Sequence, residues 1–130
     1  MKNFRLMIVF AIVAAFIVCG SVALANDTWV YTDNYGAEYY LRGRDGGASW
    51  AGARVVKVQG NEVTPLLYRF EDIRGVLYSI SYGESFVHPG ATIKKGSLYR
   101  DSNPDPVAML LWEKYLSNSN YGRGAPMWNR

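Results

Sequence analysis

Apolar and polar side chains alternate most clearly in the middle of the chain, from Glu62 to Glu71. Leu66, Tyr68 and Phe70 fall on one face of an extended strand there, and the residues between them fall on the other. A period of two is typical of a strand that buries one side. Pro65 cannot donate to a strand ladder, so we expect the usable part of this strand to begin after it or to lie at a sheet edge.

The same alternation returns from Val76 to Tyr82, after a tight connection at Asp72–Gly75. The two stretches therefore predict an antiparallel hairpin. Its buried face is expected to centre on Tyr68, Phe70, Tyr78 and Ile80, covered by Leu110 and Leu111. Cross-strand aromatic pairs add to the stability of such a face.

Short runs rich in Val, Ile and Tyr precede this hairpin and are separated by Gly, Asn and Asp, as antiparallel strands are. Strands are predicted at Trp29–Thr32, Ala37–Leu41 and Ala53–Gln59, with a turn at Asp33–Gly36, a glycine-rich loop at Gly43–Gly52 and a turn at Gly60–Asn61. After Tyr82 the pattern weakens. There Ser85–His88 and Tyr99 are interpreted as short edge pieces around a loop at Pro89–Ser97.

A helix is predicted from Pro106 to about Leu116. Asp105 is a favourable N-cap and proline is favoured at the first helical position. The segment from Val107 to Trp112 is apolar on nearly every side, so the helix should pack deeply. The fold class is therefore α+β: an antiparallel β-sheet meander of about five or six strands with one packed C-terminal helix.

The first 25 residues have the pattern of a secretory signal peptide. Lys2 and Arg5 precede an apolar run from 6 to 18, and small residues at 23 and 25 suit signal peptidase. A membrane anchor is the alternative, but a spanning helix needs about 20 apolar residues. We expect cleavage before Asn26, a single domain over 26–117, a loose tail over 118–130, and no stable membrane span after cleavage.

Loss of this segment changes the charge and the available chemistry. Lys2 and Arg5 are two of the 14 basic residues, so 12 remain against 11 acidic ones, which gives no argument for a nucleic-acid partner. Cys19 is the only cysteine and also leaves. Thiol catalysis, iron–sulfur clusters and cysteine-ligated zinc are thus excluded from the mature chain. Its stability must come from one aromatic-rich core.

Candidate metal and catalytic residues are few. Asp101, Asn103 and Asp105 have the alternate spacing of a calcium loop, but Pro106 and Trp112 occupy the places where that loop needs glycine and glutamate. Helix capping and a turn explain these residues better.

His88 is the only histidine, and only Glu84 stands near it in the sequence. We interpret it as a loop residue, with no catalytic or metal site, because triads and zinc sites need further partners. The segment Gly43–Gly47 lacks the Lys-Ser or Lys-Thr of a phosphate loop. No cofactor is expected.

Tyr35, Tyr39 and Tyr40 are the candidate binding surface, in or near the first hairpin. Exposed aromatic side chains bind sugar rings and partner proteins well. Tyr39 and Tyr40 are adjacent and should point to opposite faces of a strand. The alternative is that they are ordinary tyrosines at a sheet margin.

The order of features resembles small exported domains of diderm bacteria, in outline the surface-adhesin protein E family. The resemblance rests on the signal peptide, Trp29–Tyr31, Glu38–Leu41, Val55–Val58, Tyr68–Phe70, Tyr78–Ile80 and the helix near Leu110–Leu116. It implies an antiparallel sheet with a packed helix, in the periplasm or at the outer surface, without enzymatic activity.

The leading hypothesis is a non-enzymatic exported binding or structural module whose partner is a protein or glycan of the cell surface or envelope. The alternatives are a periplasmic inhibitor or peptidoglycan-associated protein, and an enzyme. A deep cleft lined by Asp, Glu and His88 would favour an enzyme, whereas a shallow aromatic face would favour binding. A binding module should tolerate the loss of His88 and depend on an exposed aromatic such as Tyr35 or Tyr40.

Overall fold

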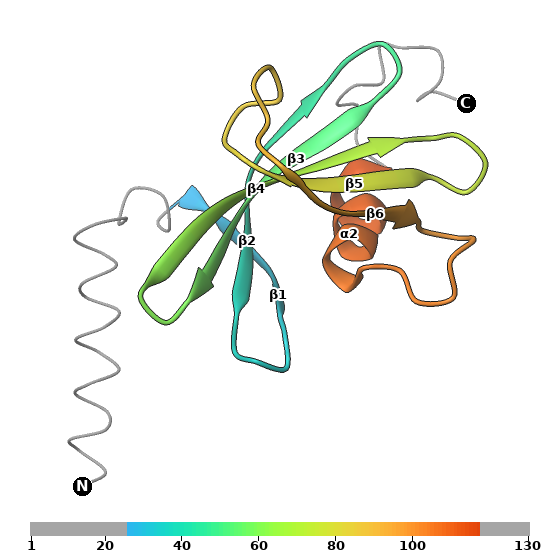
Figure 1. Ribbon diagram of the computed structural model, residues 1–130. Coiled ribbons are helices and arrows are strands. Elements are labelled where there is room, and N and C mark those ends of the chain that lie inside the picture. Colours follow the sequence, from blue (N-terminus) through green and yellow to red (C-terminus); the bar gives the residue numbers. More distant parts are fainter. Residues whose placement is uncertain (1–25, 118–130) are drawn as a thin grey trace, which may run out of the picture.

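The computed structural model describes residues 26–117, which form one six-stranded antiparallel sheet with a helical segment on one face (Figure 1). The strands are β1 (Thr28–Thr32), β2 (Glu38–Gly46), β3 (Ala51–Gln59), β4 (Glu62–Glu71), β5 (Leu77–Tyr82) and β6 (Thr92–Ser97). Each pairs with the next along the chain, which confirms the predicted antiparallel meander and packed helix. The predicted signal peptide and tail lie outside the described residues. Within 26–117 no helix is long and apolar enough to cross a membrane.

The helical segment comprises α2 (Pro106–Leu110) and the π-helical η1 (Leu111–Leu116). As predicted, Pro106 stands in the first turn and the Asp105 carboxylate accepts a hydrogen bond from the Ala108 N–H at 3.0 Å. The helix widens in η1, where the Ser117 N–H donates to the Trp112 carbonyl five residues earlier at 2.7 Å. The sequence pattern did not indicate this π-helical turn.

The core lies between the helix and the face of the sheet turned towards it, called here the inner face. Tyr68, Phe70, Tyr78 and Ile80 are all buried on it, as predicted. The Phe70 ring lies 5.7 Å from that of Trp112. Of the two leucines expected to cover the hairpin, Leu111 is fully buried and Leu110 is partly buried against the core.

The opposite, outer face is partly covered as well. Leu67, whose alternation puts it there, is only 1% exposed. The loop between β5 and β6 passes over this face, and its Phe86 ring lies 4.9 Å from that of Trp50. The Arg69 guanidinium lies 4.4 Å from the Trp50 ring. Gly52 lies beneath both rings, where a side chain would collide with them.

The predicted glycine-rich loop at Gly43–Gly52 is wrong over most of its length. β2 continues to Gly46 and β3 starts at Ala51, so only 47–50 connect them. A shift of register between Leu41 and Gly43 keeps the two strands paired. Glycine here marks a bulge and a close approach of aromatic rings, the two uses it has inside strands.

The predicted loop at Pro89–Ser97 is wrong too, because it contains β6. This edge strand carries Lys94 and Lys95 and has four exposed residues in succession, so it shows no alternation to detect. Edge strands commonly carry lysine, which discourages pairing with other chains. Ser85–His88 and Tyr99, interpreted as edge pieces, lie in a loop and a turn instead.

Pro65 lies inside β4, a central strand, and pairs with Val56. Its carbonyl accepts from the Gly83 N–H, and the nitrogen of a strand residue faces the same neighbour as its carbonyl. The missing N–H therefore faces the place where β5 has ended at Tyr82. The prediction that the strand begins after Pro65 or lies at an edge is corrected accordingly.

The helix covers only part of the inner face. It packs under the end of the sheet that carries the β2–β3 and β4–β5 turns, where Phe70 meets Trp112 (Figure 1). The other end, with the β1–β2 and β3–β4 turns, extends beyond it. Asp105, at the start of α2, marks the boundary between the two parts.

Candidate binding groove

The three tyrosines predicted as a binding surface do not share one. Tyr35, at the β1–β2 turn, is 85% exposed. Tyr39 lies on the inner face and packs against the core, whereas Tyr40 pairs with Trp29 and Val56 on the outer face. Burial, together with the Glu38 carboxylate, raises the pKa of the Tyr40 phenol.

A hollow of about 280 Å³ occupies the uncovered part of the inner face, and we call it the inner groove. Its apolar and aromatic lining comes from Tyr39, Leu66, Tyr68, Ile80, Tyr82 and Ile93. Its polar lining comes from Lys57, Glu62, Thr64, Lys94 and Asp105. Five strands and the helix start contribute to one site.

The register of the sheet brings these residues together. Tyr39 pairs with Lys57 across β2 and β3, and Tyr68 pairs with Ile80 across β4 and β5. Ile80 in turn pairs with Lys94 on β6. Because directly paired residues point to the same face, these three strand pairs build the groove from alternate positions.

Tyr68 lies deepest in the groove and is only 2% exposed. Its hydroxyl forms no hydrogen bond with any residue of 26–117. Burial raises the pKa of this phenol well above its ordinary value, and the Asp105 carboxylate and the Tyr39 and Tyr78 phenols add to the effect. The group is therefore a neutral donor and acceptor. The hydroxyl oxygen is not fully enclosed by protein, so it can form hydrogen bonds with water or with a ligand in the groove.

Tyr39 forms the wall near the first hairpin. Its hydroxyl lies 3.3 Å from Asp33 Oδ2, and the Lys57 ammonium lies 5.9 Å from its ring centre. Burial, followed by the charge and the hydrogen bond of Asp33, raises the pKa of Tyr39 to about 12. This phenol also stays neutral at physiological pH.

Asp33 fixes the turn behind Tyr39. Its Oδ1 accepts the N–H groups of Tyr35 and Ala37 at 2.9 and 3.0 Å. Slight burial acts to raise the pKa of Asp33, but these two bonds, the hydrogen bond from Tyr39 and the positive charge of Lys57 lower it on balance. The turn holds Tyr39 in place as a result.

Asp105 closes the groove at the helix start. One carboxylate oxygen caps α2 and the other lies 3.5 Å from the Lys94 ammonium. Its backbone N–H donates to the Tyr78 hydroxyl at 3.1 Å. With every part of Asp105 engaged, this wall is held rigidly.

The rim of the inner groove is apolar and open. Tyr82 is 49% exposed and Ile93 is 48% exposed, although both are large apolar side chains. The sequence pattern predicts Tyr68 in the core and does not indicate Tyr82, Ile93 and Lys94 as site residues. The alternation of β5 does put Tyr82 on the inner face, and that is the one signal that could have identified it.

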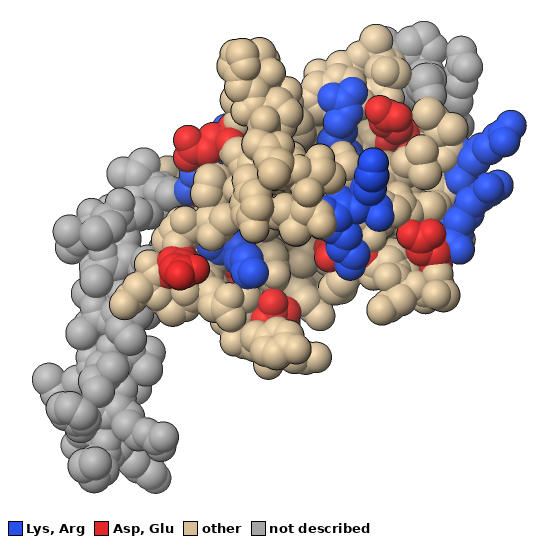
Figure 2. All heavy atoms as spheres, viewed as in Figure 1, with Lys and Arg blue, Asp and Glu red and all other residues tan. Residues whose placement is uncertain are grey.

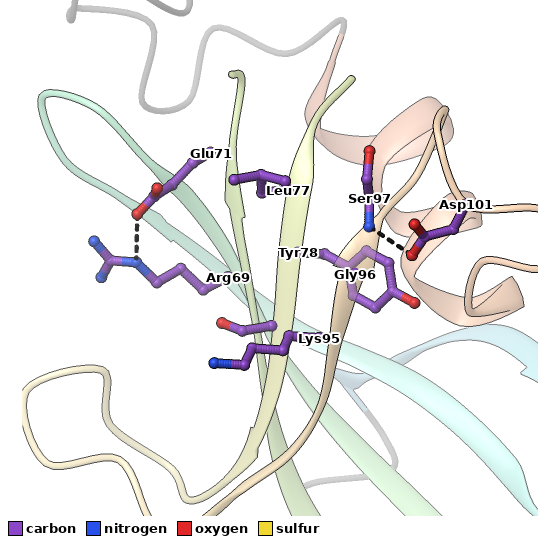
Figure 3. Close-up of a pocket in the computed structure, with 9 residues that line it drawn as sticks. Arg69, Glu71, Leu77, Tyr78, Lys95, Gly96, Ser97 and Asp101 are labelled. Atoms are coloured by element: carbon purple, nitrogen blue, oxygen red, sulfur yellow. Dashed lines mark hydrogen bonds and ion pairs between the residues drawn. The ribbon is translucent and has the colours of Figure 1, made fainter. Parts of the chain in front are cut away.

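A larger hollow of about 460 Å³ lies by the edge formed by β5 and β6 (Figure 3). Arg69 and Glu71, 3.6 Å apart, lie on one side of these strands, while Tyr78 and Asp101 lie on the other. Asp101 is already engaged, because it accepts the Ser97 N–H at 2.9 Å. In a binding pocket a few polar groups converge on one point, and the polar groups of this hollow do not.

His88 is exposed in the β5–β6 loop and lines neither of these hollows. Among residues 26–117, no three His, Cys, Asp or Glu side chains are grouped so that they could hold a metal ion. Of the residues considered as a calcium loop, Asp101 binds the Ser97 N–H and Asp105 caps the helix.

Charged side chains are dispersed over the molecule. Figure 2 shows Lys and Arg interspersed with Asp and Glu on the visible face. Arg42 lies 3.4 Å from Asp27, and Arg54 lies 3.1 Å from Asp45. Arg42 and Arg44 both lie on β2.

Comparison of the chain with protein-family models, with curated proteins and with solved structures found no match.

Proposed function

We propose that this protein is an exported, non-enzymatic binding module that holds a component of the cell envelope or cell surface in the inner groove. One observation carries the proposal: the Tyr68 hydroxyl, which has no hydrogen-bond partner among the described residues, faces a groove whose rim exposes Tyr82 and Ile93. An exposed apolar rim and a floor hydroxyl that no described protein group engages both favour a ligand.

The chemistry of the groove favours binding over catalysis. Burial raises the pKa of the Tyr39 and Tyr68 phenols and keeps them neutral, and the Asp105 carboxylate is engaged as a cap and an ion pair. The imidazole of His88, the usual type of general base, lies on an exposed loop and does not line the groove. A shallow aromatic surface of this kind holds a ligand without transferring a proton.

Export and an adhesin-like role remain part of the same proposal. The sequence supports export through its signal-peptide pattern over 1–25. The six-stranded sheet with a C-terminal helix is compatible with the architecture that the resemblance to the surface-adhesin protein E family implies. The periplasm and the outer surface both fit an envelope partner.

A periplasmic inhibitor is the second candidate, favoured by Tyr35. This side chain protrudes from a short turn, and its backbone is fixed by Asp33. A rigid protruding aromatic is suited to insertion into a partner's cleft. The two candidates depend on different residues, so they can be separated by mutation.

The test measures retention of labelled mature protein, residues 26–130, on isolated cell envelopes of the producing organism. The binding-module proposal expects Tyr82→Ala to weaken retention by about tenfold or more, with Tyr35→Ala and the outer-face control Val63→Ala within twofold of wild type. Circular dichroism of each variant checks folding. Retention that is lost with Tyr35→Ala and kept with Tyr82→Ala would support the inhibitor, and equal retention by all four proteins would overturn the groove proposal.

A further inference from the structure

We infer that the inner groove takes one ring of an uncharged, hydroxyl-rich glycan, which rests on the proposed function and specifies its ligand. The inference depends on the size of the groove, on the kinds of polar group that face it and on their balance of charge. Each of these restricts the ligand independently.

The size limits the ligand to one ring-sized unit. At about 280 Å³ the groove is just below the range of roughly 300–1,000 Å³ typical of small-molecule pockets. The exposure of Tyr82 and Ile93 leaves the rim open, so a chain can continue out of it. A polymer that presents one repeating ring at a time fits this shape.

Phenols supply the recognition chemistry. Tyr39, Tyr68 and Tyr82 offer ring surfaces together with hydroxyls that both donate and accept hydrogen bonds. A sugar ring has the complementary arrangement, with C–H groups on its faces and hydroxyls on its edge. The deep, unpartnered Tyr68 hydroxyl is suited to one of those edge hydroxyls.

The charges facing the groove cancel. Lys57 and Lys94 are balanced by Glu62 and Asp105, and Lys94 and Asp105 already pair with each other. A strongly anionic ligand would meet two carboxylates, and a cationic one would meet two ammonium groups. Hydroxyls can donate to the carboxylates and accept from the ammonium groups. A neutral glycan can therefore form hydrogen bonds with both kinds of charged group.

A peptide is less well accommodated. Extended peptides are usually recognised through main-chain hydrogen bonds at a free strand edge. Leu66 and Tyr68, on the floor of the groove, pair with β3 on one side of β4 and with β5 on the other. The floor offers a ligand only side chains, as a saccharide site does.

The experiment applies mature protein to a printed array of neutral oligosaccharides, acidic oligosaccharides and gelatin, and then measures the best ligand by calorimetry. Two variants each remove a single hydroxyl: Tyr68→Phe in the groove and Tyr40→Phe on the outer face as the matched control. We expect neutral oligosaccharides to bind best. We expect Tyr68→Phe to weaken binding by about tenfold, the effect of one buried hydrogen bond, and Tyr40→Phe to stay within twofold.

Preferred binding of acidic oligosaccharides, preferred binding of gelatin, or equal binding by Tyr68→Phe and wild type would each overturn the inference. If no oligosaccharide binds while envelope retention still depends on Tyr82, the glycan inference fails and the proposed function stands. If envelope retention is also independent of Tyr82, both fail.

Discussion

The hydroxyl of Tyr78, on β5, accepts a hydrogen bond from the backbone N–H of Asp105 at 3.1 Å, so the sheet holds the residue before the helix in place. Tyr78 is buried at 3% exposure, which makes this link part of the core. The helix can therefore cover the sheet only beyond Asp105. The inner groove is the part of the inner face that this arrangement leaves uncovered.

Removing the helix cap should lower stability moderately. Asp105→Ala deletes the carboxylate that accepts the Ala108 N–H, and loss of an N-cap costs about 1 kcal/mol. Asp105→Asn keeps a capping oxygen and is the control. Urea unfolding at neutral pH measures the difference, and an unchanged free energy of unfolding for Asp105→Ala would contradict the assigned role of the cap.

Phe70→Ala should nearly unfold the domain. The ring is fully buried against Trp112, and truncation of a core phenylalanine costs about 3–5 kcal/mol. Leu77→Ala, at a position that is 42% exposed on the outer face, should cost less than about 1 kcal/mol. Equilibrium unfolding compares the two variants, and similar losses would place Phe70 outside the core.

The β4–β5 connection contains backbone strain that glycine can relieve. Arg74 and Val76 have φ values of +44° and +59°. A non-glycine residue with positive φ destabilises the folded state by roughly 1–2 kcal/mol. Replacing it with glycine removes this strain but costs about 0.5–1 kcal/mol, because unfolded glycine has more conformational freedom to lose. Arg74→Gly should therefore raise the melting temperature slightly.

Gly75→Ala, at φ +100°, is the opposite case and should lower the melting temperature. Its new methyl group would approach the Ser97 hydroxyl and the Arg100 side chain at 3.0 Å. A lower melting temperature for Arg74→Gly would show that its side chain contributes more than the strain costs.

Stability should fall at alkaline pH. Folding raises the pKa of Tyr39 to about 12 and that of Tyr68 well above its ordinary value. The folded state keeps these protons when the unfolded chain, with tyrosine pKa values near 10, begins to lose them. The contribution of these two protonated phenols to the free energy of unfolding is complete below about pH 10 and is lost as the pH rises through about 12. Unfolding measured between pH 8 and 12 tests this, and Tyr39→Phe should flatten the profile.

Export should remove the first 25 residues. The expected mature protein begins at Asn26, so intact-mass analysis of protein recovered outside the cytoplasm should give the mass of residues 26–130. Recovery of a species that retains Met1 to Ala25 would instead support a membrane anchor.

The fold was predictable wherever one side of a strand is buried and the other is not. Leu66, Tyr68 and Phe70 reveal β4 in this way, and Asp105 with Pro106 reveals the helix start. β6 was missed because an exposed edge strand has no alternation. Gly52 was wrongly predicted to lie in a loop. A glycine is needed there because the Phe86 ring packs against it, and Phe86 is far away in the sequence.

The candidate site was harder to predict than the fold. Tyr68 was correctly assigned to the buried face, but the lack of a partner for its hydroxyl depends on where the helix begins, 38 positions later. Tyr35 and Tyr40 were predicted together because they are close in the sequence. In the structure Tyr35 protrudes from the β1–β2 turn, whereas Tyr40 lies on the outer face of the sheet. Convergence of side chains from five strands is a property of register, which local patterns do not determine.

The most direct test of the groove as the binding site is an NMR titration of isotope-labelled mature protein with soluble fragments of isolated cell envelopes. Amide shifts report contact residue by residue without assuming what the ligand is. If the inner groove is the binding site, the largest shifts cluster at Tyr68, Tyr82, Ile93 and Lys94, and Tyr68→Phe reduces them. Shifts concentrated at Tyr35, or on the outer face around Tyr40, would contradict it.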